Sequence, residues 1–403
     1  MKVGIITDGL EYAPLSIRSY IENLARALLK IHGDDIILLH RQKSSHPLYR
    51  EGKEILLPVI DKGSLYNPVS FVRRRIHDFF YYVKIRDSLE EQGIDVLHFP
   101  DLGRPAPPLC AATLPLRIVV TNHGMAQLSL PARLCYGRTV SMQQVIELKE
   151  FLKWRLIFAK RCEALITVSE SEKRILCEKG SFPEEKVHVI YHGVSPDFGP
   201  QPITTVEIVL KKYGIERPYV LHTSAYQPKK NTKRVVKAFD TLETDHSLVI
   251  VGPEQAIQTI GEVKKKDKVI MVGFVDKKDL ISLYSGAEAF VFPSLHESFG
   301  MPIVEAMACG CPVVTSHEFS MPEVAGDAAV LVNPYSLEDI TSGLRKVLTD
   351  LTFREELRER GLKRVQKFSW ERSAEEHWKV YEKVCYNDHG CAQDLNRQSV
   401  RRT

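Results

Sequence analysis

The stretch EAFVFPSLHESFGMPIVEAMACGCPVVTS, residues 288–316, decides the fold of the region around it. Residues 288–293 and 312–316 are rich in the aromatic and β-branched residues that favour strands. Pro302 suits the first turn of a helix between them, and Gly310 suits the end of that helix. The stretch therefore predicts a strand, a helix and a second strand that lies parallel to the first.

Short apolar runs of this kind alternate with helical patterns along most of the 403 residues. The first series of candidate strands comprises residues 3–7, 35–40, 54–58, 95–99, 117–121, 164–168 and 186–190. The second series comprises residues 219–223, 247–252, 268–273, 288–293, 312–316 and 328–332. Apolar strands separated by helices predict parallel sheets that are covered on both faces. The predicted fold class is therefore α/β, with two doubly wound, Rossmann-like domains.

Composition excludes several classes of protein. A net charge of +4 is too small to indicate a nucleic-acid-binding protein, and no apolar run approaches the ~18 residues of a membrane span. The first residues, MKVGIITDGL, lack the apolar region and cleavage site of a signal peptide, so we expect a cytoplasmic protein. The eight cysteines do not show the spacing of a zinc site. We expect them to be reduced and structural.

Glu297 follows the predicted strand 288–293 and therefore lies near its carboxyl end, where ligands of open parallel sheets bind. Gly300 and Met301 begin the next helix, whose free amide groups suit an anion or a row of hydroxyls. Glu305, farther along that helix, can accept two hydrogen bonds from a vicinal diol such as a ribose. One alternative stays open, in which Glu297 is a surface loop residue and Glu305 only favours the helix dipole.

Lys229 and Lys230 stand between the predicted strand 219–223 and the helix that follows it. Two ammonium groups beside a helix N-terminus can hold a diphosphate and stabilise its charge as it leaves. The alternative is a solvated basic loop, because further basic residues follow in the helix.

Two residues of the first half are also candidates. His123 lies at the tip of the predicted strand 117–121, and Ser16 lies where the first helix begins. A lone histidine is more often structural, but a position at a strand end favours a role in a ligand site.

Taken together, these features resemble the retaining glycosyltransferases of the glycogen-synthase-like, group 1 family, which have the GT-B fold. Glu297 and Glu305 match the family's E-x7-E signature. Other similar stretches are SIRSYIENLARAL, DVLHFP, VVTNHG, ALITVSESEKRIL, VHVIYHGV, QPKKN, VGFVDKKDLISLYSGAEAFVFPS and FSWERSAEEHWKVYEKV.

The resemblance implies a domain organisation in which two domains face a central cleft. A Pro- and Gly-rich stretch, residues 192–204, marks the break between an N-terminal acceptor-side domain, 1–198, and a nucleotide-sugar-binding domain, 199–370. The resemblance adds a C-terminal helix, 371–388, that crosses back onto the first domain. The polar residues 389–403 are expected to form a flexible tail.

The resemblance also implies roles for the candidate residues. The catalytic group would comprise His123, Glu297, Lys229 and Lys230, and the donor-binding group Ser16, Phe299, Gly300, Met301 and Glu305. No metal and no cofactor are expected, because lysines and helix ends do the work that a cation does elsewhere.

The implied reaction moves a hexosyl group from a nucleotide diphosphate sugar to a hydroxyl of a glycan or lipid-linked glycan, with retention of anomeric configuration. Mannose is slightly favoured, because QPKKN resembles a motif that is frequent in mannosyltransferases. Two alternatives stay open: a UDP-sugar 2-epimerase and a non-catalytic subunit that binds nucleotide sugars. The partners would be the donor and the acceptor, with no nucleic acid.

Some residues depart from the family pattern. Many members have arginine where Ala225 or Lys229 stands, and glycine where Ser16 stands. These departures raise the possibility of an inactive partner subunit. Residues 71–93 mix aromatic and basic side chains and fit either peripheral contact with the inner membrane face or an ordinary packed helix, which we favour.

Overall fold

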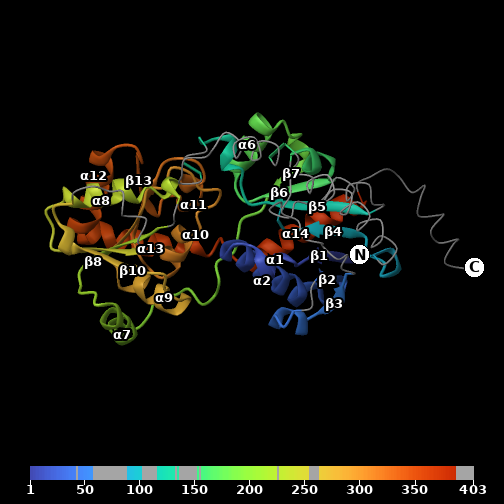
Figure 1. Cartoon of the computed structure of the whole chain (residues 1–403), viewed down its shortest axis with the longest axis horizontal. Helices are drawn as coiled ribbons and strands as arrows, with labels where there is room; N and C mark the ends of the chain where they lie inside the picture. Colours follow the sequence, from blue (N-terminus) through green and yellow to red (C-terminus); the bar gives the residue numbers. More distant parts are fainter. Residues whose placement is uncertain are drawn as a thin grey trace, which may run out of the picture.

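The computed structural model describes residues 1–41, 44–57, 89–101, 116–131, 134–135, 152–153, 156–224, 227–253 and 263–386. In this part of the chain, two α/β domains lie next to each other along the long axis (Figure 1). Ala225, residues 71–88 and the predicted tail 389–403 lie outside the described residues.

The first domain contains a seven-stranded parallel sheet in the order β3-β2-β1-β4-β5-β6-β7. Its strands are β1 (Val3–Ile6), β2 (Ile36–His40), β3 (Lys53–Leu56), β4 (Val96–Phe99), β5 (Arg117–Asn122), β6 (Ala164–Thr167) and β7 (Val187–Val189). Val3 of β1 lies opposite Ile36 on one side and Val96 on the other. The chain therefore reverses its winding direction between β1 and β4.

The second domain repeats this arrangement with a six-stranded parallel sheet in the order β10-β9-β8-β11-β12-β13. Its strands are β8 (Tyr219–Thr223), β9 (Ser247–Val251), β10 (Val269–Gly273), β11 (Ala289–Phe292), β12 (Val313–Ser316) and β13 (Ala329–Val332). Here the winding direction reverses between β8 and β11. Each strand predicted from the sequence corresponds to one of these strands, so the predicted α/β fold class with two doubly wound sheets is confirmed.

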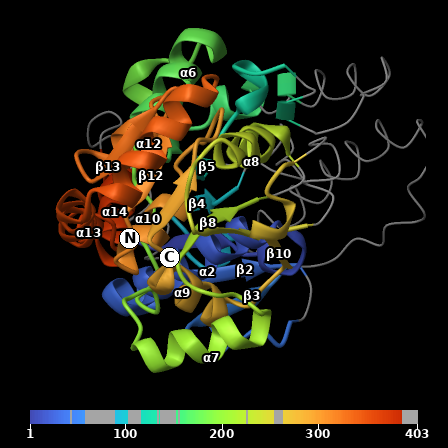
Figure 2. The same cartoon turned by 90° about the vertical axis from the view of Figure 1, so that its left-hand side faces the viewer.

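Helices cover both faces of the second sheet. They are α7 (Ile203–Tyr213), α8 (Thr232–Asp240), α9 (Lys277–Gly286), α10 (Met301–Ala308), α11 (Met321–Ala325), α12 (Leu337–Thr349) and α13 (Leu351–Val365). Figure 2 shows α8 and α12 on one side of β8, and α7 and α9 on the other. Two separate apolar cores lie on these two faces, which explains why most residues of the strands are apolar.

The first sheet is covered by α2 (Leu15–His32) and α14 (Trp370–Tyr386) on one face, and in part by α6 (Glu170–Gly180) on the other. A short helix, α1 (Gly9–Tyr12), precedes α2 and lies at the end of this domain nearest the second (Figure 1). Helix α14 buries Trp370, Ala374, Tyr381 and other residues that recur every three or four positions. These side chains join the core between α2 and the first sheet, although α14 follows the second domain in the sequence.

A buried chain of hydrogen bonds fixes α14 to the first sheet. Its members, in order, are Tyr381, His98, Thr121, Tyr20, His377 and Ser373, and the successive distances are 2.8, 2.8, 3.1, 2.8 and 2.7 Å. Burial lowers the pKa of His377 to about 4, so its ring is neutral at pH 7. Because Nδ1 of His377 must donate to the Ser373 carbonyl, Nε2 accepts from the Tyr20 hydroxyl. This fixes the direction of every other bond in the chain.

Within the described ranges, no helix is both long enough and apolar enough to cross a membrane. The two reversal points, at β1 and β4 and at β8 and β11, are the places where open parallel sheets bind ligands. The candidate residues of the second domain all follow β8 or β11.

Candidate functional site

The two lysines and Glu297 meet because their strands are neighbours. Lys229 and Lys230 end a short 3₁₀ turn, Pro228–Lys230, that follows β8. Glu297 lies in the loop between β11 and α10, and β11 pairs directly with β8. Since both strands run in the same direction, their carboxyl ends bring the basic and acidic residues to the same edge of the sheet.

Glu297 forms a buried ion pair with Lys230. Nζ of Lys230 lies 2.8 Å from Oε1 of Glu297, and the Ser294 hydroxyl lies 2.6 Å from the same oxygen. Only 9% of Glu297 is exposed, and burial alone would raise its pKa. The charges of Lys230 and Lys229 and the two hydrogen bonds outweigh burial and lower the pKa of Glu297 to about 2. Glu297 is therefore a carboxylate at any physiological pH.

The loops that carry these residues are tied together by backbone and side-chain contacts. The carbonyl oxygen of Lys229 accepts from the backbone N–H of Leu295 at 2.7 Å and lies 2.8 Å from the Ser294 hydroxyl. Asn231 adopts a left-handed conformation, φ 63°, and its side-chain amide donates to the carbonyls of Pro293 and Pro334. The Asn231 side chain thus joins two loops instead of capping α8.

Lys229 differs from Lys230 in its side-chain contacts. Within the described part of the chain, its Nζ atom forms neither a hydrogen bond nor an ion pair. It is half-buried, and it is close enough to Glu297 to lower the pKa of that carboxyl. Lys229 therefore contributes a positive charge that is available to a ligand.

The turn before α10 offers a row of free amide groups. In the described residues, the N–H groups of Phe299, Gly300 and Met301 donate to no acceptor. Gly300 has φ 101° and ψ 46°, a conformation that L side chains rarely adopt. Such a left-handed residue beside a helix start turns successive N–H groups toward one point and favours an anion there. The Phe299 side chain itself is buried in the apolar core, so only its backbone N–H is available to a ligand.

Glu305 lies in α10 and has a very different environment from Glu297. Its Oε2 atom lies 3.4 Å from the Tyr284 hydroxyl. Removal of water by the surrounding protein raises the pKa of Glu305 to about 7, because the hydrogen bond and the distant lysines only partly compensate. The two carboxylates of the site therefore differ in charge near pH 7, Glu297 being fully ionised and Glu305 half protonated.

His123 and Ser16 belong to the first domain. His123 follows β5, and its Nε2 donates to the carbonyl of Pro100 at 2.8 Å. The Tyr20 ring, which belongs to the hydrogen-bonded chain described above, packs edge-on against the His123 ring at 4.3 Å between centroids. Ser16 is exposed in the first turn of α2, and its hydroxyl has no hydrogen-bond partner in the described residues.

Comparison with known proteins places both halves of the chain in glycosyltransferase families. Residues 207–364 match the family described as "Glycosyl transferases group 1", and residues 17–198 match "Glycosyltransferase Family 4". The chain belongs to the group 1 glycosyltransferases. The positions of the group 1 E-x7-E signature, Glu297 and Glu305, lie within the first match.

Among relatives of this group 1 glycosyltransferase is the serotype-specific mannosyltransferase WbdA of Escherichia coli, 31% identical over 239 residues. Another is the O-antigen chain mannosyltransferase B of Escherichia coli, 30% identical over 217 residues. These alignments cover 56% and 51% of this chain, but only 29% of WbdA and 57% of the second relative. The chain thus spans a minor part of one relative and about half of the other.

Solved structures show that this group 1 glycosyltransferase has the GT-B fold. A glycosyltransferase from Rickettsia africae matches with a TM-score of 0.72 and 19% identity, covering 96% of this chain and 99% of that one. HepE of Anabaena, solved with UDP and glucose, matches with a TM-score of 0.69 and 15% identity, covering 95% and 99%.

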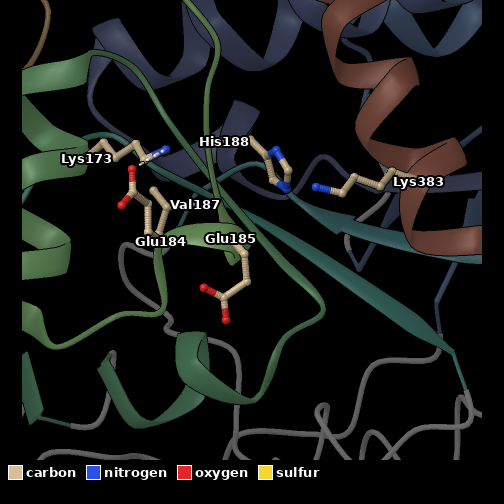
Figure 3. A pocket seen from close by; sticks show the side chains of 6 residues that line it. All are labelled: Lys173, Glu184, Glu185, Val187, His188 and Lys383. Carbon is tan, nitrogen blue, oxygen red and sulfur yellow. Dashed lines mark ion pairs between the residues drawn. The ribbon is translucent and has the colours of Figure 1, made fainter. Parts of the chain in front are cut away.

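A groove on the outer edge of the first sheet lies apart from the loops after β8 and β11, which carry the candidate residues of the second domain. It has a volume of about 460 Å³ and is lined by Lys173, Glu184, Glu185, Val187, His188 and Lys383. Figure 3 shows Lys173 and Glu184 paired on one side of His188 and Lys383 on the other. Two carboxylates at the groove would repel a diphosphate, so it is a poorer donor site than the ends of β8 and β11.

The described residues contain no cluster of three or more His, Cys, Asp or Glu side chains that is placed to hold a metal ion. Sequence reasoning missed Ser294 and Ser320, which support the Glu297 loop. The Ser320 hydroxyl lies 2.7 Å from the Glu297 carbonyl and 3.0 Å from that of Phe299. A serine is common in loops, so neither position gave a signal before the contacts were known.

Proposed function

We propose that the protein is a retaining glycosyltransferase that moves a hexosyl group from a nucleotide diphosphate sugar to an acceptor hydroxyl. The observation that carries the proposal is the junction of β8 and β11. In the described residues, it brings Lys229, whose Nζ atom has no partner, the Lys230–Glu297 pair and three free amide groups to the same edge of the sheet. Positive charges and free N–H groups beside a carboxylate suit a diphosphate with an attached sugar.

The proposed chemistry needs no protein nucleophile. The bond between the anomeric carbon and the distal phosphate oxygen breaks, and its electron pair stays on that oxygen. The acceptor oxygen then bonds to the anomeric carbon on the same face, and its proton passes to the departing phosphate. Lys229, Lys230 and the amides of Gly300 and Met301 stabilise the charge that builds on the phosphate. Glu297 orients the sugar, Glu305 holds the ribose, and His123 contacts the sugar near the reacting carbon.

The proposed donor is GDP-mannose, because relatives that align with half of this chain are named as mannosyltransferases. The name of the second relative, which specifies an O-antigen chain, favours a growing glycan as the acceptor, and we propose that this glycan is free or lipid-linked. A lipid-linked acceptor would place the protein in the cytoplasm, in peripheral contact with the inner membrane face. No cofactor or metal is assigned, since Lys229 and Lys230 supply the charge that a cation would otherwise bring.

Thermal-shift and transfer assays with GDP-mannose, UDP-glucose and ADP-glucose test this proposal. We expect GDP-mannose to stabilise the protein most, to be cleaved slowly without acceptor and to be transferred with retained configuration. EDTA should leave the rate unchanged. Stabilisation without cleavage or transfer would indicate a binding subunit, release of a 2-epimer from a UDP-sugar would indicate an epimerase, and rescue of EDTA inhibition by Mg²⁺ would contradict metal independence.

Donor affinity should increase with pH between pH 6 and 8. The ribose hydroxyls need an ionised Glu305, and the pKa of Glu305 is about 7, so the ionised fraction rises about tenfold over this range. The raised pKa has the opposite effect on folding, because the folded state favours the protonated form and loses stability as pH rises from about 4.5 to 7.

The dissociation constant for GDP-mannose, measured by calorimetry at pH 6, 7 and 8, checks this expectation. Glu305→Gln is the matched control, because it keeps the shape of the side chain but cannot titrate, and its affinity should not vary with pH. A wild-type affinity that is flat across this range would remove Glu305 from the ribose site.

A further inference from the structure

The start of α6, in the first domain, contacts the loop that carries Glu297 in the second. The Ser169 hydroxyl donates to the carbonyl of Ser298 at 2.6 Å. The approach at Gly124 is so close that a Cβ atom there would lie 1.8 Å from the Ser298 Oγ. The loop beside Glu297 is therefore packed directly against the other domain.

A second contact joins the same helix start to α11. The carboxylate of Glu323 accepts from the backbone N–H of Glu170 at 2.7 Å and from that of Ser171 at 3.2 Å. Free N–H groups at a helix start are normally satisfied by residues of the same segment. Here a side chain from the other domain satisfies them, so the N-terminus of α6 is completed only when the domains are together.

Between these two contacts lies a buried pair of ionisable side chains. Glu172 of α6 is 1% exposed and His296, the residue before Glu297, is fully buried. Oε1 of Glu172 lies 3.4 Å from Nε2 of His296, and Oε2 accepts from the backbone N–H of Met125 at 3.2 Å. In the described residues, neither ring nitrogen of His296 has a hydrogen-bond partner, nor does Oε1 of Glu172. Burial raises the pKa of the Glu172 carboxyl, and the backbone N–H of Met125 and the nearby Ser298 hydroxyl only partly offset this rise.

Unpaired polar groups in a dry interface favour a small movement that pairs them. The gap between Oε1 and Nε2 exceeds a normal hydrogen bond, about 2.9 Å, by only about half an ångström. A slight further approach of the domains would close the gap. Because His296 is bonded covalently to Glu297, the same movement would set the position of the Glu297 carboxylate.

We propose that Glu172 and His296 are positioning residues, which join the two domains and place Glu297 for the reaction. The predicted effect on kcat rests on the proposed function. The predicted contact between the two domains does not. Neither residue touches the donor in this account. Both act through the loop from His296 to Ser298. They position Glu297 only when the two domains are in contact.

Glu172→Ala is expected to lower kcat for transfer by about tenfold or more, a typical size for coupling between two sites. The KM for the donor should change less than twofold, since Lys229, Lys230 and Glu305 all belong to the second domain. Glu172→Gln should restore kcat to within about threefold, because its amide can still accept from Met125 and donate to Nε2 of His296. Glu170→Ala, an exposed neighbour whose backbone contact is unchanged, is the matched control and should behave as wild type.

A double-mutant cycle tests the pairing itself. His296→Ala and Glu172→Ala should each reduce kcat, and the double variant should lose little more than either one. Losses that multiply, or a Glu172→Ala variant with wild-type kcat, would overturn the proposal. A purely structural role predicts that Glu172→Ala lowers the melting temperature along with kcat and that Glu172→Gln restores neither. That pattern would also overturn the proposal.

Small-angle X-ray scattering separates failure of this inference from failure of the proposed function. The double variant should show a larger radius of gyration than wild type, because the contact between the domains is weakened. If wild type transfers no sugar from any nucleotide donor, the proposed function fails. The scattering measurement still shows whether Glu172 and His296 hold the two domains together. Identical scattering curves for wild type and the double variant would contradict the inference whatever the activity.

Discussion

Lys230→Ala is expected to lower the rate of glycosyl transfer by about 10²–10³-fold, the usual loss when one fixed donor to a developing oxyanion is removed. The structure adds a second reason. Lys230 forms a hydrogen bond of 2.8 Å with Glu297 and lies over the Phe292 ring at 4.9 Å, so its ammonium is held in one place. Removal of Lys230 also takes away the nearest positive charge from the buried Glu297 carboxylate. The pKa of Glu297 should then rise, and the loop that carries it should be held less firmly.

The measurement is kcat and KM with GDP-mannose, together with the melting temperature and the circular dichroism spectrum of the variant. Lys233→Ala is the matched control, because it removes the same charge from an exposed position in α8 of the same segment. Near-normal turnover of Lys230→Ala would mean that another group carries the phosphate charge. An equal loss in Lys233→Ala would show that general electrostatic attraction, and not this position, controls the rate.

The sequence was sufficient for the fold because each sheet is buried on both faces. Runs such as YVLHT and EAFVFP consist mostly of apolar residues and lack the alternation of polar and apolar residues that a half-exposed strand shows. The site in the second domain followed from the same signal, since Lys229, Lys230 and Glu297 come directly after β8 and β11. The rule that ligands bind at strand ends then placed them together before any distance was known.

The contacts across the domain boundary could not be predicted in this way. Glu172 and His296 are separated by 124 positions and carry no periodic signal, so only the packing of the two domains brings them within 3.4 Å. Ser169 and Glu172 have the residue types and the spacing of a reciprocal cap at the start of α6. The Ser169 hydroxyl does accept from the backbone N–H of Glu172 at 3.1 Å, but the Glu172 carboxylate turns to Met125 and His296 instead. One of the two hydrogen bonds of the capping box is therefore present, and contacts with other parts of the fold replace the second.

Glu297→Gln is expected to reduce transfer by at least about 10²-fold while the protein stays folded. Glutamine has the shape of glutamate and keeps an oxygen that can accept from Lys230 and Ser294, so the loop should keep its form. The change removes one negative charge that is fully present in wild type, because the pKa of Glu297 is about 2. The loss therefore reports on the charge itself and not on the packing.

Binding of the nucleoside diphosphate distinguishes this account from simple damage to the site. In wild type, Glu297 neutralises Lys230 at 2.8 Å and opposes an incoming diphosphate. Without that charge, the Glu297→Gln variant should bind GDP as tightly as wild type or more tightly, even though transfer is nearly lost. Its donor affinity should still rise between pH 6 and 8, since Glu305 is untouched. Glu318→Gln, a change of the same kind at a more exposed position after β12, should alter neither property. A variant that loses GDP binding and turnover together would show that Glu297 maintains the site and has no separate part in transfer.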